Sequence, residues 1–527
     1  MRRSRICLLS ILFLAHTTLA EITFSVTLDP QVATGPVSGR LVVSLVPTGS
    51  GRGVRSPLEA PFWENQTPMF GVDVRDLKPG SAAVVDAGAD FSTVKLAELP
   101  KGEYLAAAWI IANRQTSSWK NDAGNFYSAP TKITVDPAQA APIGLTLTRR
   151  TEAPKLPKVD GVEWFSIKST LLSDFHGREV LLKAGVVLPV GYDPKKTYGV
   201  VYWIPGFGDG QEDALRFARL WHTERDGTVE SALAKRAFLI VLDPESPNGH
   251  TLWADSDNNG PWAQALVTEL IPALEAKFPL IPKPHARLLR GHSSGGWSSV
   301  WLAINHPEVF GGAWASAPDP VSFMSFQNVR IYLDHLMYEE PSSQEGTGEV
   351  QRNTTPHELP SYRRGGKVLM TIRQENGGER VLGANQTSGQ QWASWQAVFG
   401  PRVGERGWGK GHPAALYDSI SGAIDAGVAE HFKKYDIAHL LQLRSKMYGP
   451  LLSERVRIAV GDEDNFYLNE AVASLKAHLE QLGYAARIAI VPGADHGTVL
   501  GSPEVRAFPA EMLKVMEAGG GENVPKK

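Results

Sequence analysis

The stretch Arg287-Leu-Leu-Arg-Gly-His-Ser-Ser-Gly-Gly-Trp297 decides the fold of this chain. It predicts a strand over 286–290, a tight turn over 291–295 and a helix over 297–305. Glycine stands two residues before and two residues after Ser293, where a side chain would clash if a strand turned directly into a helix. This G-x-S-x-G pattern between a strand and a helix is typical of a nucleophile elbow, which exposes the serine hydroxyl. The alternative is a glycine-rich turn whose serines only cap the helix.

The composition is that of an ordinary globular protein. The chain has 527 residues, 43% hydrophobic and 21% charged, which is enough for two or three domains with sizeable cores. The formal charge is −3, and it becomes −6 when Arg2, Arg3 and Arg5 are left out, because 50 basic residues then face 56 acidic ones. We therefore expect neither nucleic-acid binding nor attachment to an anionic membrane, since both need a basic face.

The first twenty residues differ from the rest of the chain. Three arginines precede the apolar run Ile6–Ala15, and Thr18-Leu19-Ala20 provides small residues for cleavage. This pattern predicts a signal peptide over 1–20, cut after Ala20, whose apolar run is too short to span a membrane. The single cysteine, Cys7, lies inside it, so the mature protein has no disulfide. We expect a bacterial periplasmic or secreted protein.

Residues 21–150 predict a small immunoglobulin-like β-sandwich, because short β-branched runs alternate with Gly and Pro clusters. The predicted strands are 22–28, 39–45, 104–111, 132–135 and 143–148. A packing or spacer role is favoured over glycan or surface binding, because a fold alone does not imply a function. Two prolines and mixed charges then indicate a linker over 151–160.

Buried strands alternate with helices in 161–317 and again in 450–517, which predicts an α/β domain with a mostly parallel sheet. The expected strands are 179–188, 198–204, 237–242, 312–317, 455–460 and 487–491, and the expected helices are 263–278 and 468–482. The alternation stops over 318–449, which is polar and Gly-rich. We expect this insertion to form a cap or lid, with helices over 323–337 and 428–447; the alternative is a surface excursion. The tail, 518–527, is expected to be disordered.

A serine nucleophile needs a base, and the base needs an acid. Asp464 follows the predicted strand that ends at Val460, and His496 follows the one that ends at Val491. Because the carboxyl ends of parallel strands meet at one edge, we expect Ser293, Asp464 and His496 to form a catalytic triad. Asp464 is preferred over Asp462 and Glu463 because it stands just before a predicted helix.

An oxyanion hole needs two backbone N–H groups. One is expected from Ser294, and the other from the loop after the strand that ends at Ile204, with Phe207 as first choice and Gly208 as second. We expect substrate contacts from side chains of the loop 249–262 and from the helix after the elbow: His250, Trp253, Asn259, Trp262 and Trp297. The loop could instead cap its following helix, and core packing explains most tryptophans. His292 is interpreted as a packed residue, not the base. No metal-ligand spacing is present, and neither a metal nor a cofactor is expected.

At four segments the sequence resembles the putative esterase family of α/β-hydrolases, which includes esterase D, the antigen 85 mycolyltransferases, feruloyl esterases and enterochelin esterase-like proteins. The segments are Leu188–Asp193, Gly291–Gly296, Gly461–Phe466 and Asp495–Gly497. The likeness covers about 165–318 and 450–515, and leaves out the front domain and the insertion.

The resemblance implies an α/β-hydrolase fold and an exported serine esterase that acts on small-molecule, glycan-linked or lipid-linked esters. Ser293 would attack the acyl carbonyl, His496 would shuttle the proton, and water would release the acid. An acyltransferase with the same triad, a serine peptidase and a non-catalytic glycan- or envelope-binding protein are the alternatives. The sequence indicates no oligomeric state.

Overall fold

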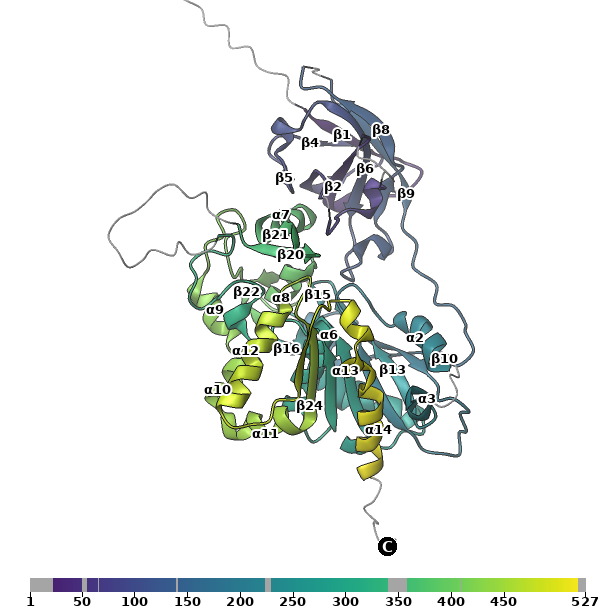
Figure 1. Cartoon of the computed structure of the whole chain (residues 1–527). Helices are drawn as coiled ribbons and strands as arrows, with labels where there is room; N and C mark the ends of the chain where they lie inside the picture. Colours follow the sequence, from purple (N-terminus) through teal and green to yellow (C-terminus); the bar gives the residue numbers. More distant parts are fainter. Residues whose placement is uncertain are drawn as a thin grey trace, which may run out of the picture.

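The computed structural model describes residues 22–49, 55–64, 66–138, 141–222, 229–339, 358–407 and 409–519. The predicted signal peptide and residues 520–527 of the predicted disordered tail lie outside these ranges. In Figure 1 the front part of the chain sits above an α/β part, and the green segment with α7 (Ile372–Leu382), β20 (Pro360–Arg364) and β21 (Lys367–Thr371) lies between the two. None of the helices in the described ranges is long and apolar enough to cross a membrane.

The α/β part is built on a sheet to which the described residues contribute eight strands. Their spatial order is β10 (Val162–Lys168), β11 (Leu181–Val187), β13 (Ala237–Leu242), β12 (Gly199–Ile204), β18 (Arg287–His292), β19 (Gly312–Ser316), β24 (Val456–Gly461) and β25 (Ile488–Val491). The strands from β13 to β25 pair in parallel, whereas β10 pairs antiparallel with β11 and β11 pairs antiparallel with β13. Every residue of β12, β13 and β19 is buried, as expected for strands covered on both faces. The chain therefore has the predicted α/β architecture.

Helices cover both faces of this sheet (Figure 1). Those that pack near it include α2 (Asp213–His222), α3 (Val229–Ala234), α6 (Ser294–Asn305), α12 (Leu468–Gln481) and α14 (Phe508–Gly519). The helix expected over 263–278 is interrupted: α4 (Trp262–Ala265) and α5 (Ile271–Lys277) flank a π-helical stretch, Leu266–Leu270. The structure thus adds α2, α3 and α14 to the elements that the sequence predicted.

The front domain is all-β apart from short 3-10 turns in its described residues. Its strands are β1 (Phe24–Leu28), β2 (Val37–Pro47), β3 (Met69–Leu77), β4 (Ala82–Val85), β5 (Asp90–Phe91), β6 (Gly102–Ile111), β7 (Phe126–Ser128), β8 (Thr131–Val135) and β9 (Ile143–Arg150). They form one hydrogen-bonded network in the order β4-β1-β9-β7-β6-β2-β3-β5, with β8 on β6. Because they are not separated into two sheets by their pairing, the immunoglobulin-like sandwich stays a prediction.

The insertion between β19 and β24 holds two hairpins and five helices in its described residues. They are β20 (Pro360–Arg364) with β21 (Lys367–Thr371), β22 (Arg402–Gly404) with β23 (Gly411–Pro413), α7 (Ile372–Leu382), α8 (Gln391–Phe399), α9 (Ala426–Phe432), α10 (Ile437–Leu443) and α11 (Ser445–Arg455). The helix predicted over 323–337 is wrong, because only Phe323–Ser325 makes a 3-10 turn. Phe326 instead fills an aromatic cluster, with its ring 5.0 Å from that of Trp395. The helix predicted over 428–447 is split where Asp436 caps α10.

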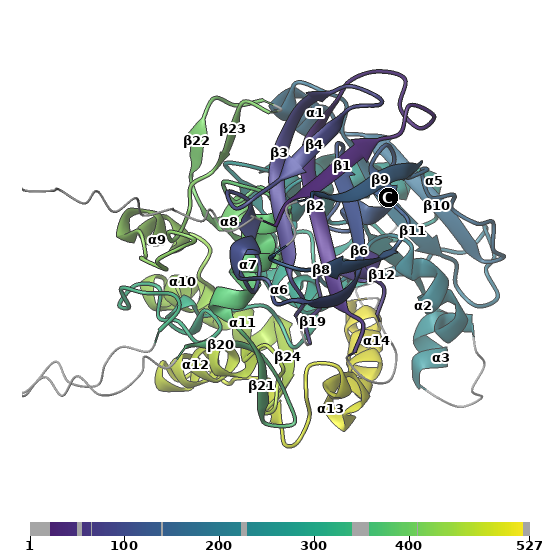
Figure 2. The same ribbon diagram turned by 90° about the horizontal axis from the view of Figure 1, so that it is seen from above.

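The front domain packs against the last turn of α7. Arg40 on β2 donates to the carbonyls of Arg380 and Val381, each at 2.9 Å. Arg114 donates to the carbonyl of Leu382 at 2.7 Å. The last carbonyls of a helix lack partners within it and carry partial negative charge, so two guanidinium groups are favourable caps there. Figure 2, seen from above, shows the front strands lying over α7 and the adjacent part of the sheet.

Candidate active site

Ser293 occupies the turn between β18 and α6. Its backbone has φ 56° and ψ −126°, a conformation that a side-chain-bearing residue adopts only under strain. A Cβ added to Gly291 would lie 2.0 Å from the carbonyl oxygen of Gly295, and one added to Gly295 would lie 1.9 Å from that of Ile204. The backbone is therefore too crowded for side chains at both flanking positions. The strand, turn and helix form as the motif predicted.

His496 and Asp464 meet at the carboxyl ends of the last two strands. His496 Nδ1 lies 2.8 Å from Asp464 Oδ2, and Asp464 is fully buried. The other carboxylate oxygen of Asp464 accepts the N–H groups of Phe466 and Leu468 at 2.9 and 3.2 Å. The backbone N–H of His496 donates to Asn465 Oδ1 at 3.1 Å. The ring is thus held in one orientation, with the proton on Nδ1 and with Nε2 left as the basic nitrogen.

The pKa of His496 lies above its ordinary value of 6.5. Burial lowers it, but the charge and hydrogen bond of Asp464 raise it, and the charges of Asp319 and Asp495 add to that effect. The net direction shows that the imidazolium form is stabilised in this site, as a base that accepts a proton during a reaction requires.

The neighbouring acids have other partners. Asp462 accepts the N–H of Gly493 at 2.7 Å, and Glu463 lies 3.8 Å from Arg363. Asp495 accepts the N–H of Thr498 at 2.7 Å within its own loop. Of the acids considered from the sequence, the structure places Asp464 against the His496 ring.

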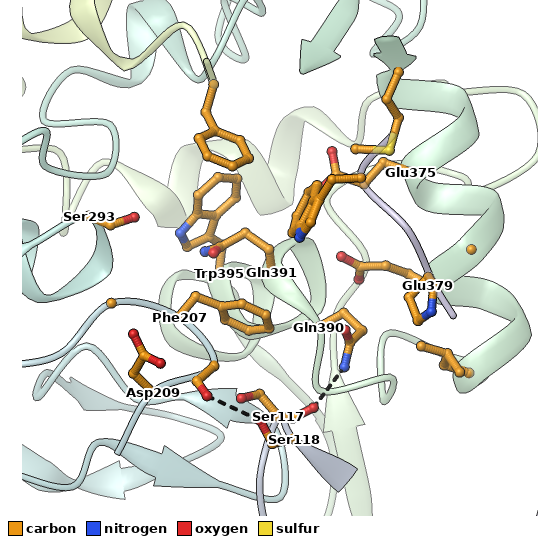
Figure 3. Close-up of a pocket in the computed structure, with 18 of the residues that line it drawn as sticks. Ser117, Ser118, Phe207, Asp209, Ser293, Glu375, Glu379, Gln390, Gln391 and Trp395 are labelled. Carbon is orange, nitrogen blue, oxygen red and sulfur yellow. Dashed lines mark hydrogen bonds between the residues drawn. The ribbon is translucent and has the colours of Figure 1, made fainter. Parts of the chain in front are cut away.

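Ser293 and His496 line a single cavity of about 530 Å³. The α/β part contributes Phe207 and Gly208 to its wall, and the insertion contributes Met370 and Trp395. The front domain supplies a third wall, which comprises residues 61–63, Gln66 and residues 117–121. Figure 3 shows Ser293 on one side of this space and the residues of α7 on the other, with Trp395 and Gln391 between them. No sequence pattern predicted the third wall, because these residues lie in connecting segments of ordinary composition.

A tight turn over Pro205–Asp209 lies against Ser293. A Cβ on Gly206 would be 3.4 Å from that of Ser293. The Asp209 N–H donates to the Gly206 carbonyl at 3.3 Å, and Gly208 has φ +86°, which favours glycine. Within the described residues the N–H of Phe207 makes no hydrogen bond. Ser294 begins α6, where N–H groups lack partners inside the helix. The two N–H groups predicted for an oxyanion hole therefore both lie beside the elbow.

The five predicted substrate contacts are not brought to the cavity. His250, Trp253, Asn259, Trp262 and Trp297 are all buried, and none of them lines it. The loop 249–262 folds inward, where Asn258 donates to the carbonyls of Ala397 and Gly400 in the insertion. These side chains therefore lie in the core and not in the substrate-binding wall that the sequence predicted.

His250 has a defined role in that core. Its Nδ1 accepts the Leu252 N–H at 3.0 Å, so Nε2 carries the proton and donates to the Pro205 carbonyl at 3.1 Å. Burial lowers its pKa to about 4, so the ring is neutral. His250 thus holds the first residue of the turn beside Ser293.

Asp319 lines the same cavity beside the elbow and was not predicted from the sequence. It accepts the Ser294 hydroxyl at 2.7 Å and Trp395 Nε1 at 2.6 Å. Burial raises its pKa to about 6, although these hydrogen bonds act in the opposite direction. A signal was present, because Asp319 follows β19 at the same carboxyl edge as Ser293, Asp464 and His496.

His292 also lines the cavity, beside His496. Its Nδ1 is 3.2 Å from the Ser316 hydroxyl, and its ring centre is 4.6 Å from that of His496. Burial and the charge of His496 hold the pKa of His292 well below its ordinary value. The interpretation of His292 as a packed residue agrees with its hydrogen bond to Ser316. It did not predict that His292 lines the cavity.

Two glutamates on α7 line the far side of the cavity. Glu379 accepts the N–H groups of Trp392 and Ala393 at 2.8 and 3.0 Å, and so caps the start of α8. Glu375 accepts Trp392 Nε1 at 3.0 Å. Burial raises the pKa of Glu375 to about 8 and that of Glu379 to about 7. In the described residues no group of His, Cys, Asp and Glu is arranged to hold a metal ion.

The match to a family model agrees with the likeness seen in the sequence. A family model described as putative esterase matches residues 179–496, which is more than half of the chain. Among solved structures, a ferulic acid esterase has 12% identity and a TM-score of 0.40, with 67% of this chain and 98% of that chain covered. A CE1 ferulic acid esterase from Anaeromyces mucronatus has 15% identity and a TM-score of 0.31, covering 69% and 94%. An S-formylglutathione hydrolase from Agrobacterium tumefaciens has 14% identity and a TM-score of 0.34, covering 68% and 97%.

Proposed function

Since this chain belongs to the putative esterase family, with an α/β-hydrolase fold and carboxylic-ester hydrolase chemistry, we propose that Ser293 is its nucleophile, His496 its base and Asp464 the acid that orients the base. The observation that carries this proposal is the shared cavity. A serine on a strained turn and a histidine fixed by a buried carboxylate face the same space, beside N–H groups suited to an oxyanion.

The geometry supports a two-step reaction. The basic nitrogen of His496 takes the Ser293 proton while the serine oxygen attacks the acyl carbon. The developing oxyanion is stabilised by the N–H groups of Ser294 and Phe207, with Gly208 as the second choice. His496 then gives its proton to the leaving alcohol, and water attacks the acyl-enzyme by the same route. Asp464 stabilises the imidazolium that forms in each step.

The finer architecture is part of the same proposal. Residues 318–449 form a cap, because Met370, Glu375 and Trp395 of this segment line the cavity that contains Ser293. The front domain, 21–150, is a β-sandwich joined through the linker 151–160. The protein is exported, and its mature form begins at Glu21. Mass spectrometry of the exported protein would test the cleavage site, and a mature N-terminus elsewhere would contradict it.

Labelling of folded protein with a fluorophosphonate tests the nucleophile. Wild type and the control variant Ser81→Ala, which changes an exposed serine of the front domain, should both label and hydrolyse short-chain p-nitrophenyl esters. Ser293→Ala should not label and should lose at least about 10³-fold in kcat/KM, because the nucleophile is gone. A folded Ser293→Ala protein that labels or hydrolyses at the wild-type rate would overturn the proposal.

Product analysis distinguishes ester hydrolysis from acyl transfer, from peptide cleavage and from non-catalytic binding. Free acid formed without any added alcohol indicates hydrolysis, whereas acyl products formed only with a sugar or lipid acceptor indicate transfer. Cleavage of peptides and not esters would favour a peptidase. Binding of glycans without any turnover would favour a non-catalytic protein.

A further inference from the structure

The turn Pro205–Asp209 is fixed at three of its carbonyl groups. His250 holds the carbonyl of Pro205, and the Asp209 N–H holds that of Gly206. The third bond comes from outside the α/β part: the Ser118 hydroxyl donates to the Gly208 carbonyl at 3.1 Å. Ser118 belongs to the front domain, ninety residues earlier in the chain. The domain that the sequence favoured as a spacer thus touches the turn that carries the Phe207 N–H.

The loop that carries Ser118 is stiffened by its own hydrogen bonds. Asp122 accepts the N–H groups of Gln115 and Thr116 at 2.7 and 3.0 Å, and its other oxygen accepts the Thr116 hydroxyl at 3.0 Å. Trp119 is buried inside the front domain, with its ring 5.3 Å from that of Trp109. The loop therefore presents Ser118 from a rigid base.

The same loop is anchored to both other parts of the protein. Glu245, just after β13, accepts the Ser117 N–H at 2.5 Å and the Ser117 hydroxyl at 2.9 Å. Gln390, just before α8, donates to the Ser117 carbonyl at 3.1 Å. Figure 3 draws the bonds from Ser118 to the turn and from Gln390 to Ser117 as dashed lines at the edge of the cavity. Two adjacent serines thus connect the front domain, the turn and the cap.

We propose that the front domain is a working part of the active site, and that Ser118 is a positioning residue that sets the orientation of the oxyanion turn. This inference rests on the proposed function, because it assigns the turn to the oxyanion hole. Ser118 does not touch the reacting atoms; it acts through the Gly208 carbonyl.

The physical reason lies in the turn itself. Gly206 and Gly208 flank Phe207, so the turn has little intrinsic stiffness and depends on outside bonds. When the Gly208 carbonyl loses its donor, the adjoining peptide groups can rotate, and the Phe207 N–H moves relative to Ser293. A displaced donor stabilises the transition state less while the ground state is bound as before, so kcat should fall more than KM rises.

The test compares four forms of the full chain: wild type, Ser118→Ala, Ser118→Thr and the distant control Ser81→Ala. With a short p-nitrophenyl ester, Ser118→Ala should lower kcat about 5- to 50-fold with KM changed less than about 2-fold, because full loss of an oxyanion donor costs about 10²–10³-fold. Ser118→Thr keeps a hydroxyl and should recover most of the rate. Thermal unfolding measured in parallel shows whether each variant is folded.

A second readout reports the oxyanion hole directly. A trifluoromethyl ketone forms a tetrahedral adduct with a serine nucleophile, and its oxyanion needs the same donors. The affinity of each of the four forms for this ketone should fall in proportion to its kcat/KM. The affinity for the product acid of the ester should stay constant. If Ser118 only stabilised the fold, the affinity for the ketone and kcat/KM would not change in proportion across the four forms.

The outcomes separate this inference from the proposed function. Hydrolysis that survives Ser293→Ala would overturn both. Loss of activity in Ser293→Ala, with a folded Ser118→Ala that retains wild-type kcat and wild-type adduct affinity, would overturn the role of Ser118 alone. If Ser118→Ala fails to fold, Glu245→Ala removes both acceptors that hold Ser117 and so weakens the same loop from the other side, which should lower kcat in the same way; a folded Glu245→Ala with unchanged kcat would then overturn the inference.

Discussion

At Gly295 the backbone leaves no room for a side chain. A Cβ there would lie 1.9 Å from the Ile204 carbonyl oxygen, so either the elbow or β12 would have to move. We expect Gly295→Ala to lose about 3 kcal/mol or more of unfolding free energy, or not to fold, because overpacking against backbone is poorly relieved. Gly144→Ala in β9 is the matched control, since its Cβ would meet no atom within 4 Å. Equal urea midpoints for the two variants would contradict the crowded elbow.

The protonation state of His496 predicts the acid side of the pH profile. The base must be neutral to accept the Ser293 proton, and its pKa lies above 6.5. Activity should therefore fall as the pH drops through a value above 6.5. Asp464→Asn removes the charge that raises this pKa most, so the acid limb should move to lower pH while the plateau rate falls about 10²–10⁴-fold. The measurement is kcat/KM against pH; an acid limb that stays in place or moves to higher pH would speak against the assignment.

Among the elements, α7 depends on the front domain for its C-terminal cap. Arg40 is buried and donates to two of its last carbonyls, and it pairs with Asp73 at 3.1 Å. Arg40→Met should lower the free energy of unfolding by about 2–4 kcal/mol, because two carbonyls at the end of the helix are left without their charged donor. Arg75→Met on the exposed side of β3 should change it by less than about 0.5 kcal/mol. Denaturant unfolding checks both, and equal effects would contradict the cap.

Several elements differ from expectation because tertiary contacts override local pattern. The segment 323–337 has apolar residues at helical spacing, yet Phe326 is used to fill the aromatic cluster beneath the cap. Conversely, α7 was not predicted, because Glu375 and Glu379 look like surface residues in the sequence. In the folded protein they are buried and accept N–H groups from α8.

In the whole molecule, the front domain, the cap and the α/β part share contacts at one cavity. We expect them to unfold together, because the loop 115–122 and α7 lose their partners when any one part opens. Intrinsic fluorescence and esterase activity should then show the same denaturant midpoint. The double variant Arg40→Met/Arg114→Met should separate the two midpoints, while Arg75→Met should not. Separate midpoints in wild type would show that the parts are independent.

The sequence by itself determined the α/β class, the elbow at Ser293 and the loops that carry Asp464 and His496. These features are short-range: crowding at a turn depends on the residues beside it, and parallel strands deliver their following loops to one edge. Local sequence patterns were therefore enough to predict that three residues, up to 203 positions apart in the chain, lie at one edge of the sheet.

Only the tertiary structure decided which walls surround Ser293. Hydrophobic periodicity reports that a face is buried but not what covers it, so it could not distinguish the inward-folded loop of His250 from a substrate wall. Nor could it show that Ser118 reaches Gly208 or that Arg40 reaches Val381, 341 residues away. Such contacts join residues whose neighbours in the sequence show no distinctive pattern, and they exist only once the domains have packed together.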